Sequence, residues 1–84
     1  MYTVYILKSE IVDRYYIGSS GNLSERLDNH NRGSCRSTKP YRPWRLVYFE
    51  KFDSRTSALI RERQIKRYKR GEAFDTLLKR GGVA

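Results

Sequence analysis

Residues 2–20, YTVYILKSEIVDRYYIGSS, carry the clearest structural signal in the chain. Two runs rich in β-branched and aromatic residues, 2–8 and 15–19, are separated by a short segment that has the composition of a turn. Such runs are typical of β-strands. The sequence therefore predicts a β-hairpin. If its strands pair antiparallel, Tyr5 and Tyr16 come near each other on one surface of the sheet.

The rest of the chain is expected to add one strand and three helices. The order ββαβαα indicates a single small α/β domain (α+β) over residues 1–84, in which helices flank a three-stranded antiparallel sheet. The first helix is expected to begin at an Asn22–Glu25 capping box and to run to about Asn31, followed by a loop over 32–43 and a strand over 44–51. The second helix is expected to be capped by Asp53 or Ser54, to run to about Arg70 and to be ended by Gly71. A short last helix is expected over 72–80.

Composition narrows the class of partner. The 84 residues suffice for one modest core, and 18 Lys and Arg against 9 Asp and Glu give a formal net charge of +9. Such a surplus favours DNA, RNA or an anionic membrane surface. No apolar run approaches a membrane span, and the start MYTVYILKSE lacks the features of a secretory signal, so we expect a cytoplasmic protein. The single cysteine, Cys35, and the single histidine, His30, exclude an internal disulfide and a Cys/His zinc cluster.

Arg26 and His30 lie one turn apart on the first predicted helix. On a helical wheel they border the apolar arc formed by Leu23 and Leu27, so both are expected at the margin of the core. The pair would supply a guanidinium and an imidazole to one site. The alternative is a solvated arginine and a histidine packed at a helix end, because such spacings often arise by chance.

Glu62 is the acidic residue that stands out in a basic helix. Its neighbours on the wheel include Ala58 and Ile65, which should face the sheet, so the carboxylate is expected to point toward the interior. Carboxylates are seldom buried without a partner. One candidate is a structural ion pair with Arg26 or Lys66. The other is a Mg²⁺ or Mn²⁺ ion, which binds through one or two carboxylates and keeps water and phosphate ligands.

Tyr5 and Tyr16 supply phenols, whose ordinary pKa of about 10 makes them poor bases. A nearby cation would lower that pKa, and a lysine or arginine beside Tyr5 or Tyr16, or a metal-bound water between them, could provide it. The other tyrosines are expected to be ordinary core or surface aromatics. Gly18 suits a position where the backbone approaches a ligand closely, or a bulge that ends a strand.

Together these residues resemble the GIY-YIG nuclease superfamily. Thr3-Val4-Tyr5 and Tyr16-Ile17-Gly18, followed by Arg26, His30 and Glu62, match its motifs in order and spacing from Met1 to about Arg70. The chain is most similar to short stand-alone bacterial members, which are similar to the N-terminal nuclease domain of an excision-repair protein. Thr3 and Val4 depart from the glycine and isoleucine of the first motif, and no asparagine follows Asn31 to match the one that some members use.

The resemblance implies a one-metal phosphodiesterase. Glu62 would hold one Mg²⁺ or Mn²⁺ ion, and Arg26 would stabilise the phosphate as negative charge builds up. Tyr5 would act as general base, or as a relay, toward the attacking water, which Tyr16 and His30 would position or deprotonate. Gly18 would lie beneath the site.

Basic residues gather in the loop 32–45 and at the helix end 61–70. Phosphate contacts from such patches give salt-dependent binding that is largely independent of sequence, and aromatic residues among them can stack on unpaired bases. The residues expected to contact substrate are Gly18, Arg36, Lys39, Arg42, Trp44, Arg45 and Lys66.

The predicted function is a metal-dependent DNA endonuclease of repair or recombination, structure-specific rather than sequence-specific. It would be a monomer or a weak homodimer that has no membrane partner. One alternative is a nucleic-acid-binding module with little or no catalysis. Another is a structural role in which Glu62 pairs with Arg26.

Overall fold

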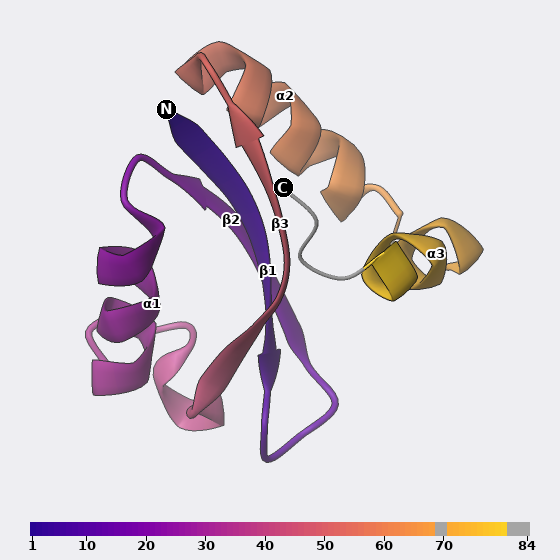
Figure 1. Cartoon of the computed structure of the whole chain (residues 1–84). Helices are drawn as coiled ribbons and strands as arrows, with labels where there is room; N and C mark the ends of the chain where they lie inside the picture. The colour runs from indigo at the N-terminus through magenta and orange to yellow at the C-terminus, as the bar shows by residue number, and fades with distance from the viewer. Residues whose placement is uncertain (69–70, 81–84) are drawn as a thin grey trace.

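The computed structural model describes residues 1–68 and 71–80, and its elements follow the predicted order ββαβαα. The strands form one antiparallel sheet with the first strand in the middle (Figure 1). The predicted α+β fold with a three-stranded antiparallel sheet is therefore confirmed. The elements are β1 (Tyr2–Ser9), β2 (Tyr15–Ser20), α1 (Leu23–Arg32), a short 3₁₀ helix η1 (Lys39–Tyr41), β3 (Trp44–Phe52), α2 (Arg55–Lys66) and α3 (Glu72–Arg80).

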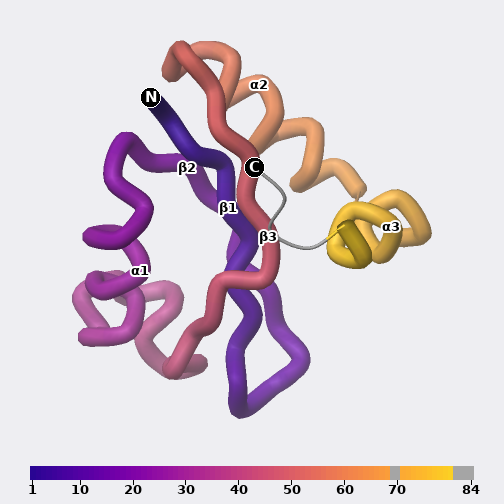
Figure 2. Tube along the Cα trace, in the orientation of Figure 1, coloured from indigo at the N-terminus to yellow at the C-terminus, as the bar shows by residue number. Residues whose placement is uncertain are grey.

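Helices cover both faces of the sheet. Helix α1 lies against one face, and α2 and α3 lie against the other (Figures 1 and 2). Because successive side chains of a strand point to opposite faces, β1 contributes to both layers. Val4 and Ile6 pack with α2 and α3, whereas Tyr5 and Leu7 pack with α1, and all four are fully buried. The central strand thus joins two separate cores.

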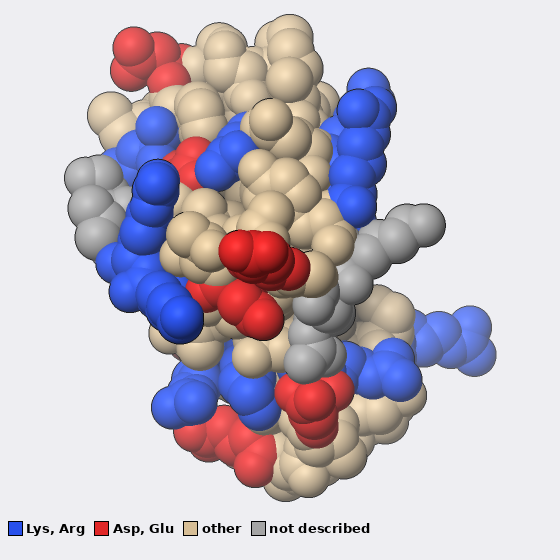
Figure 3. Space-filling view, turned by 90° about the vertical axis from the view of Figure 1, so that its right-hand side faces the viewer, with Lys and Arg blue, Asp and Glu red and all other residues tan. Residues whose placement is uncertain are grey.

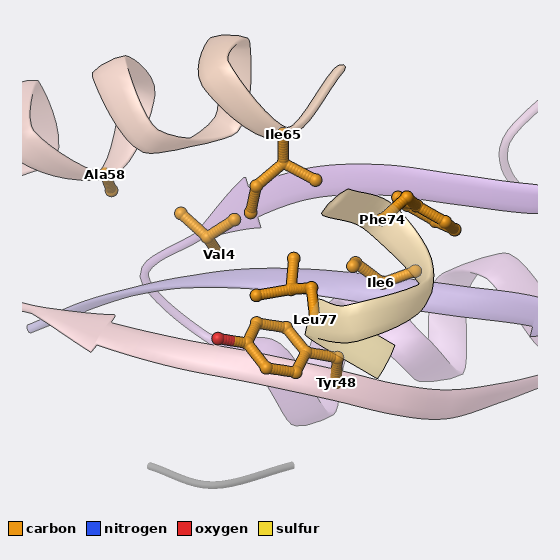
Figure 4. Close-up of a cluster of buried hydrophobic side chains, with 7 residues drawn as sticks. All are labelled: Val4, Ile6, Tyr48, Ala58, Ile65, Phe74 and Leu77. Atoms are coloured by element: carbon orange, nitrogen blue, oxygen red, sulfur yellow. The ribbon is translucent and has the colours of Figure 1, made fainter. Parts of the chain in front are cut away.

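The larger core fills the space between the sheet and helices α2 and α3 (Figure 4). An ion pair beside this core ties α2 to β3, with Arg61 Nη2 2.9 Å from Glu50 Oε2. The sequence predicts Arg61 as part of the basic helix end, but the charge of Arg61 is paired with Glu50 and stabilises the contact between α2 and β3. The buried core residues are Val4, Ile6, Tyr48, Ala58, Ile65, Phe74 and Leu77.

The start of α1 forms only half of the predicted capping box. Asn22 Oδ1 accepts a hydrogen bond from the backbone N–H of Glu25 at 3.2 Å, as a cap should. In a complete capping box the Glu25 carboxylate would accept a hydrogen bond from the backbone N–H of Asn22. Here that N–H donates instead to Ser20 Oγ at 2.9 Å. The helix ends at Gly33, whose φ of 81° lies in the left-handed region that favours glycine.

Helix α2 begins after Ser54, one of its two predicted caps, but it ends at Lys66, before the predicted end at about Arg70. The backbone N–H of Tyr68 donates to the carbonyl of Ile65 at 3.0 Å, which is a tighter turn than the α-helix makes. The ring of Tyr68 packs against the larger core, so the chain turns there toward α3. Residues 69 and 70 of the predicted helix lie outside the described residues. The last helix has its predicted bounds.

Candidate active site

Tyr5 lies at the centre of β1, and its ring crosses the edge strand β2 at Gly18. The two residues are partners in the antiparallel ladder. A Cβ atom at Gly18 would lie 2.8 Å from the Tyr5 hydroxyl and 3.0 Å from Cζ, closer than such atoms approach. The glycine therefore makes room for the phenol of Tyr5. The pairing of β1 with β2 continues through Gly18, so this glycine does not form a bulge. This packing lets a side chain from the central strand reach the edge of the sheet.

Tyr16 lies beside Tyr5, as the hairpin predicts. It pairs with Leu7, two positions along the ladder from Gly18, and the rings of the two tyrosines lie 6.3 Å apart between centroids. The Tyr16 ring is also 4.7 Å from the ring of His30. Tyr16 is only half-buried. It therefore forms the wall of the site between the buried phenol and the surface.

Helix α1 brings Arg26 and His30 to the same hydroxyl. Leu23 and Leu27 of this helix pack against the cluster that contains Tyr5, which sets the rotation of the helix. His30 lies deeper than the margin position expected for it, because it is fully buried, with Nε2 3.4 Å from the Tyr5 hydroxyl. Arg26 is half-buried and lies beside the same phenol, where its guanidinium acts to lower the pKa of Tyr5. A guanidinium and an imidazole thus converge on one phenol.

Burial raises the pKa of Tyr5 above its usual value, and the nearby Tyr16 and Glu62 add to this effect. Arg26 opposes it through its hydrogen bond and its charge, but the net shift of the pKa is upward. A cation considered from the sequence, Arg26, is therefore present, but the pKa of Tyr5 is not lowered below its usual value, because desolvation outweighs the effect of Arg26. Tyr5 is protonated at neutral pH and acts as a hydrogen-bond donor there.

Glu62 reaches the edge of β2 from the opposite layer. Its Oε1 accepts a hydrogen bond from Ser19 Oγ at 2.7 Å, and its Oε2 lies 2.7 Å from Lys66 Nζ. Its side chain is only 15% exposed, in keeping with the inward direction expected from the helical wheel. Burial alone would raise the pKa of Glu62, but the hydrogen bonds from Lys66 and Ser19 lower it below its usual value. The structural ion pair considered for Glu62 is made with Lys66 and not with Arg26.

The donor set at Glu62 fits a hard divalent cation that takes one carboxylate from the protein. Among the described residues, no three His, Cys, Asp or Glu side chains gather to form a complete metal cage. Mg²⁺ commonly binds through one or two carboxylates and fills its other positions with water and phosphate oxygens. Lys66 is 53% exposed and free to swing away, and the Ser19 hydroxyl can rotate. Glu62 is thus able to anchor an ion whose remaining ligands come from substrate and solvent.

Similarity to known proteins agrees with this arrangement. The family model described as GIY-YIG catalytic domain matches residues 1–73. The chain belongs to the GIY-YIG family. Members of this family are nucleases, and GIY-YIG nucleases generally use a divalent metal ion.

Several short bacterial proteins are similar to this chain. A UPF0213 protein of Syntrophus aciditrophicus is 43% identical over 77 residues, which cover 88% of this chain and 86% of that protein. A UPF0213 protein of Staphylococcus aureus strain Mu3 is 40% identical over 68 residues, 80% of this chain and 82% of that protein. A UPF0213 protein of Pediococcus pentosaceus is 39% identical over 67 residues, which cover 79% of this chain and 70% of that protein. No solved structure gives a significant match.

The residues expected to bind substrate in this GIY-YIG domain fall into three groups. Arg36, Lys39, Arg42 and Arg45 are exposed. Trp44 is instead 3% exposed in the core beneath α1, where its ring is not available to stack on a base, and Gly18 is likewise buried. Lys66 is paired with Glu62.

The face that carries α3 has no continuous basic surface, because acidic side chains lie among the lysines and arginines there (Figure 3). The exposed arginines and lysine that follow α1 are thus the better candidates for contact with a polyanion. Among the described residues, no helix is long and apolar enough to cross a bilayer.

Two contacts of the GIY-YIG site were not predicted from the sequence. Ser19 binds Glu62, and Thr38, which is 1% exposed, has Oγ1 2.9 Å from His30 Nδ1. The position of Ser19 next to the Tyr16-Ile17-Gly18 motif was a signal available in the sequence. Thr38 lies in a loop whose path no local pattern predicts, so only the three-dimensional structure reveals its contact.

Acidification from pH 7.5 to 5.5 is expected to destabilise the domain through His30. Burial and the charge of Arg26 hold the pKa of His30 below its usual value near 6.5, so the unfolded chain takes up the proton first. The stabilising contribution is complete above the unfolded pKa and is lost as the pH falls below it, at up to about 1.4 kcal/mol per pH unit. Urea unfolding followed by circular dichroism would measure the decrease.

His30→Gln is the matched control for that measurement. Because His30 is the only histidine, the variant should lose most of the decrease between pH 7.5 and 5.5. A hydrogen bond from Arg61 lowers the pKa of Glu50, and one from Lys66 lowers the pKa of Glu62, in both cases against the effect of burial. These carboxylates therefore take up protons only at more acidic pH. An unchanged decrease in the variant would assign the effect to other groups.

Proposed function

We propose that this protein is a metal-dependent endonuclease that hydrolyses phosphodiester bonds in nucleic acid, with DNA as its main substrate. The observation that supports this most is the convergence of Arg26, His30 and Tyr16 on the Tyr5 hydroxyl, with Glu62 arriving at the same strand edge from the other layer. Membership of a nuclease family and a net charge of +9 point to the same class of substrate.

Each side chain has a role that follows from its position. A Mg²⁺ or Mn²⁺ ion held by Glu62 would supply positive charge at the scissile phosphate. Arg26, which lies beside the Tyr5 hydroxyl, would donate hydrogen bonds to the phosphate oxygens as their charge increases. Tyr5 would bind the attacking water through its hydroxyl oxygen, and His30 would accept the phenolic proton. Tyr16, half-exposed beside both rings, would orient that water.

The substrate strand would follow the exposed cations on the α1 side of the molecule. Phosphate contacts of this kind are sensitive to salt and largely indifferent to sequence, which favours recognition of DNA structure in repair or recombination. One site cuts one strand, so a double-strand break would require a weak homodimer or a second encounter. Lys66, once released from Glu62, would be an additional phosphate contact.

A hollow of about 370 Å³ begins at Ser19, the residue that binds Glu62, and offers a path for a neighbouring nucleotide. Its one charged lining residue is Arg55. The hollow is lined by Tyr2, Ser19, Ser20, Gly21, Arg55 and Leu59.

Cleavage of labelled oligonucleotides tests the proposed function. Single-stranded, duplex, nicked and branched DNA, with RNA counterparts, would be incubated with Mg²⁺, with Mn²⁺ or with EDTA. Arg26→Lys keeps a positive charge but loses the planar fork of donors, so we expect about a 100-fold slower cleavage step. The matched control is Arg80→Lys at the exposed end of α3, which should cleave at the wild-type rate.

Absence of cleavage of every substrate by the wild-type protein would overturn the nuclease proposal. The pairing of Lys66 with Glu62 favours the second candidate function, a nucleic-acid-binding module with little catalysis, because it satisfies the site carboxylate without a metal ion. Such a module would bind DNA or RNA in a salt-sensitive manner, equally well with EDTA or Mg²⁺. Fluorescence anisotropy over a series of salt concentrations separates the two functions.

A further inference from the structure

Three buried side chains form a line that runs inward from the candidate site. The Tyr5 hydroxyl lies 3.4 Å from His30 Nε2, and His30 Nδ1 lies 2.9 Å from Thr38 Oγ1. The Thr38 hydroxyl donates to the carbonyl of Cys35 at 3.3 Å. Tyr5 and His30 are fully buried, and Thr38 is 1% exposed. Solvent does not reach these side chains, so the hydrogen-bond donors and acceptors of the protein determine where the protons lie.

The direction of these hydrogen bonds follows from a count of protons. A threonine hydroxyl has one proton, and the carbonyl of Cys35 can only accept it. Thr38 Oγ1 must then accept from His30, which places the imidazole proton on Nδ1. A neutral imidazole has only one N–H, so Nε2 carries a free lone pair that faces the Tyr5 hydroxyl.

The surroundings of Tyr5 lead to the same assignment independently. Its hydroxyl proton needs an acceptor because the side chain is buried. Arg26, the other polar neighbour of the phenol, only donates. Among the described residues, His30 is thus the hydrogen-bond partner of Tyr5 that is able to accept, and it does so through Nε2. Burial and the charge of Arg26 lower the pKa of His30, which keeps the ring neutral and this lone pair available.

Thr38 is itself held firmly by its loop. Its backbone N–H donates to the Cys35 carbonyl at 3.2 Å, and its own carbonyl accepts from Trp44 Nε1 at 2.9 Å. Trp44 is fixed in turn by Asn31, whose Oδ1 accepts from the Trp44 backbone N–H at 2.6 Å and whose Nδ2 donates to the Trp44 carbonyl at 3.0 Å. The buried tryptophan thus holds the loop that carries Thr38 against α1.

We infer that Thr38 is a positioning residue that holds His30 in the Nδ1–H tautomer, so that Nε2 is the acceptor of the Tyr5 proton. This inference rests on the proposed nuclease function for its catalytic consequence. As the water oxygen bonds to phosphorus, the water gives a proton to the Tyr5 oxygen, and the Tyr5 O–H proton passes to Nε2. The phosphorus–oxygen bond to the leaving group breaks, and that oxygen takes a proton from solvent. The imidazolium then returns its Nε2 proton to the Tyr5 oxygen, and the proton that this oxygen took from the water leaves to solvent, which completes the cycle.

The single histidine makes the tautomer directly measurable. In a long-range ¹H–¹⁵N correlation spectrum of the full ¹⁵N-labelled chain at neutral pH, the only imidazole signals come from His30. We expect the pattern of the Nδ1–H tautomer for the wild type. Thr38→Val removes the hydroxyl while keeping the shape of the side chain, so the spectrum should shift toward the Nε2–H tautomer. Thr38→Ser keeps the hydroxyl and should restore the wild-type pattern.

Kinetics supply the second measurement. Loss of one oriented hydrogen bond should reduce kcat about 5- to 10-fold in Thr38→Val and leave KM unchanged, with recovery in Thr38→Ser. An Nε2–H pattern in the wild type would overturn the assignment, as would an unchanged tautomer in Thr38→Val. The amide spectrum checks folding, and Thr38→Ala replaces the valine variant if that one does not fold. Absence of cleavage by the wild type would overturn the nuclease proposal alone, because the spectrum does not depend on turnover.

Discussion

Glu62→Gln is expected to slow metal-dependent cleavage on the order of 10³-fold or more, because a metal ion contributes several kcal/mol of transition-state stabilisation. The amide that replaces the carboxylate still accepts the hydrogen bond from Ser19, so the local structure should persist. Loss of the i,i+4 pair with Lys66 costs only about 0.2–0.5 kcal/mol. Single-turnover cleavage during a Mn²⁺ titration, together with calorimetry of Mn²⁺ binding, measures both consequences.

The control for Glu62→Gln is Glu10→Gln in the exposed turn between β1 and β2. It makes the same change of net charge at a residue without a role in the site, so cleavage and Mn²⁺ affinity should match the wild type. If Glu62→Gln bound Mn²⁺ and cleaved DNA as well as this control, the metal would have to bind elsewhere. The one-metal proposal would then be abandoned.

Tyr5→Phe should reduce the cleavage rate by about 10³-fold while the fold is retained, because the change removes one oxygen and leaves the ring against Gly18. The loss reflects the hydroxyl that connects the attacking water with His30. It should appear in kcat, since Arg26 and Glu62 still bind the phosphate and the metal ion. Single-turnover rates at saturating Mg²⁺ measure the effect.

Tyr68→Phe serves as the reference for Tyr5→Phe. Its hydroxyl accepts a hydrogen bond from Arg61 at 3.3 Å on the opposite side of the sheet, so the variant loses a comparable group outside the site. Wild-type cleavage by Tyr68→Phe and a large loss in Tyr5→Phe would assign the effect to the site. Equal rates in both variants would show that the attacking water is activated without Tyr5, and the proposed role of this residue would be wrong.

Most of the fold was accessible from local pattern. The β-branched and aromatic runs, the cap at Asn22 and the apolar spacing of Leu23 and Leu27 are short-range signals, and the strands and helices that they predict are present. The nearness of Tyr5 and Tyr16 followed from the pairing of a hairpin, which is also local. Helix α2 ends at Lys66, earlier than the sequence predicts, because the chain makes a tighter turn at Tyr68, whose ring packs against the larger core.

The interior of the site depended on contacts between distant segments. His30 is fully buried instead of lying at the predicted margin, because the loop that carries Thr38, held by Trp44 at the start of β3, packs over it, and no spacing within α1 encodes that loop. The raised pKa of Tyr5 has the same origin, since burial exceeds the effect of Arg26 only once the layers are packed together. The choice of Lys66 as the partner of Glu62 was open at the sequence level, and the helical turn between them decides it.

The edge strand β2 lies between groups that come from opposite layers, with Arg26 and His30 on α1 and Glu62 on α2. Neither helix carries a working set alone, so a molecule in which one layer has detached would hold either the carboxylate or the guanidinium, but not both in register. The arrangement of the layers thus couples assembly of the candidate site to folding of the whole domain.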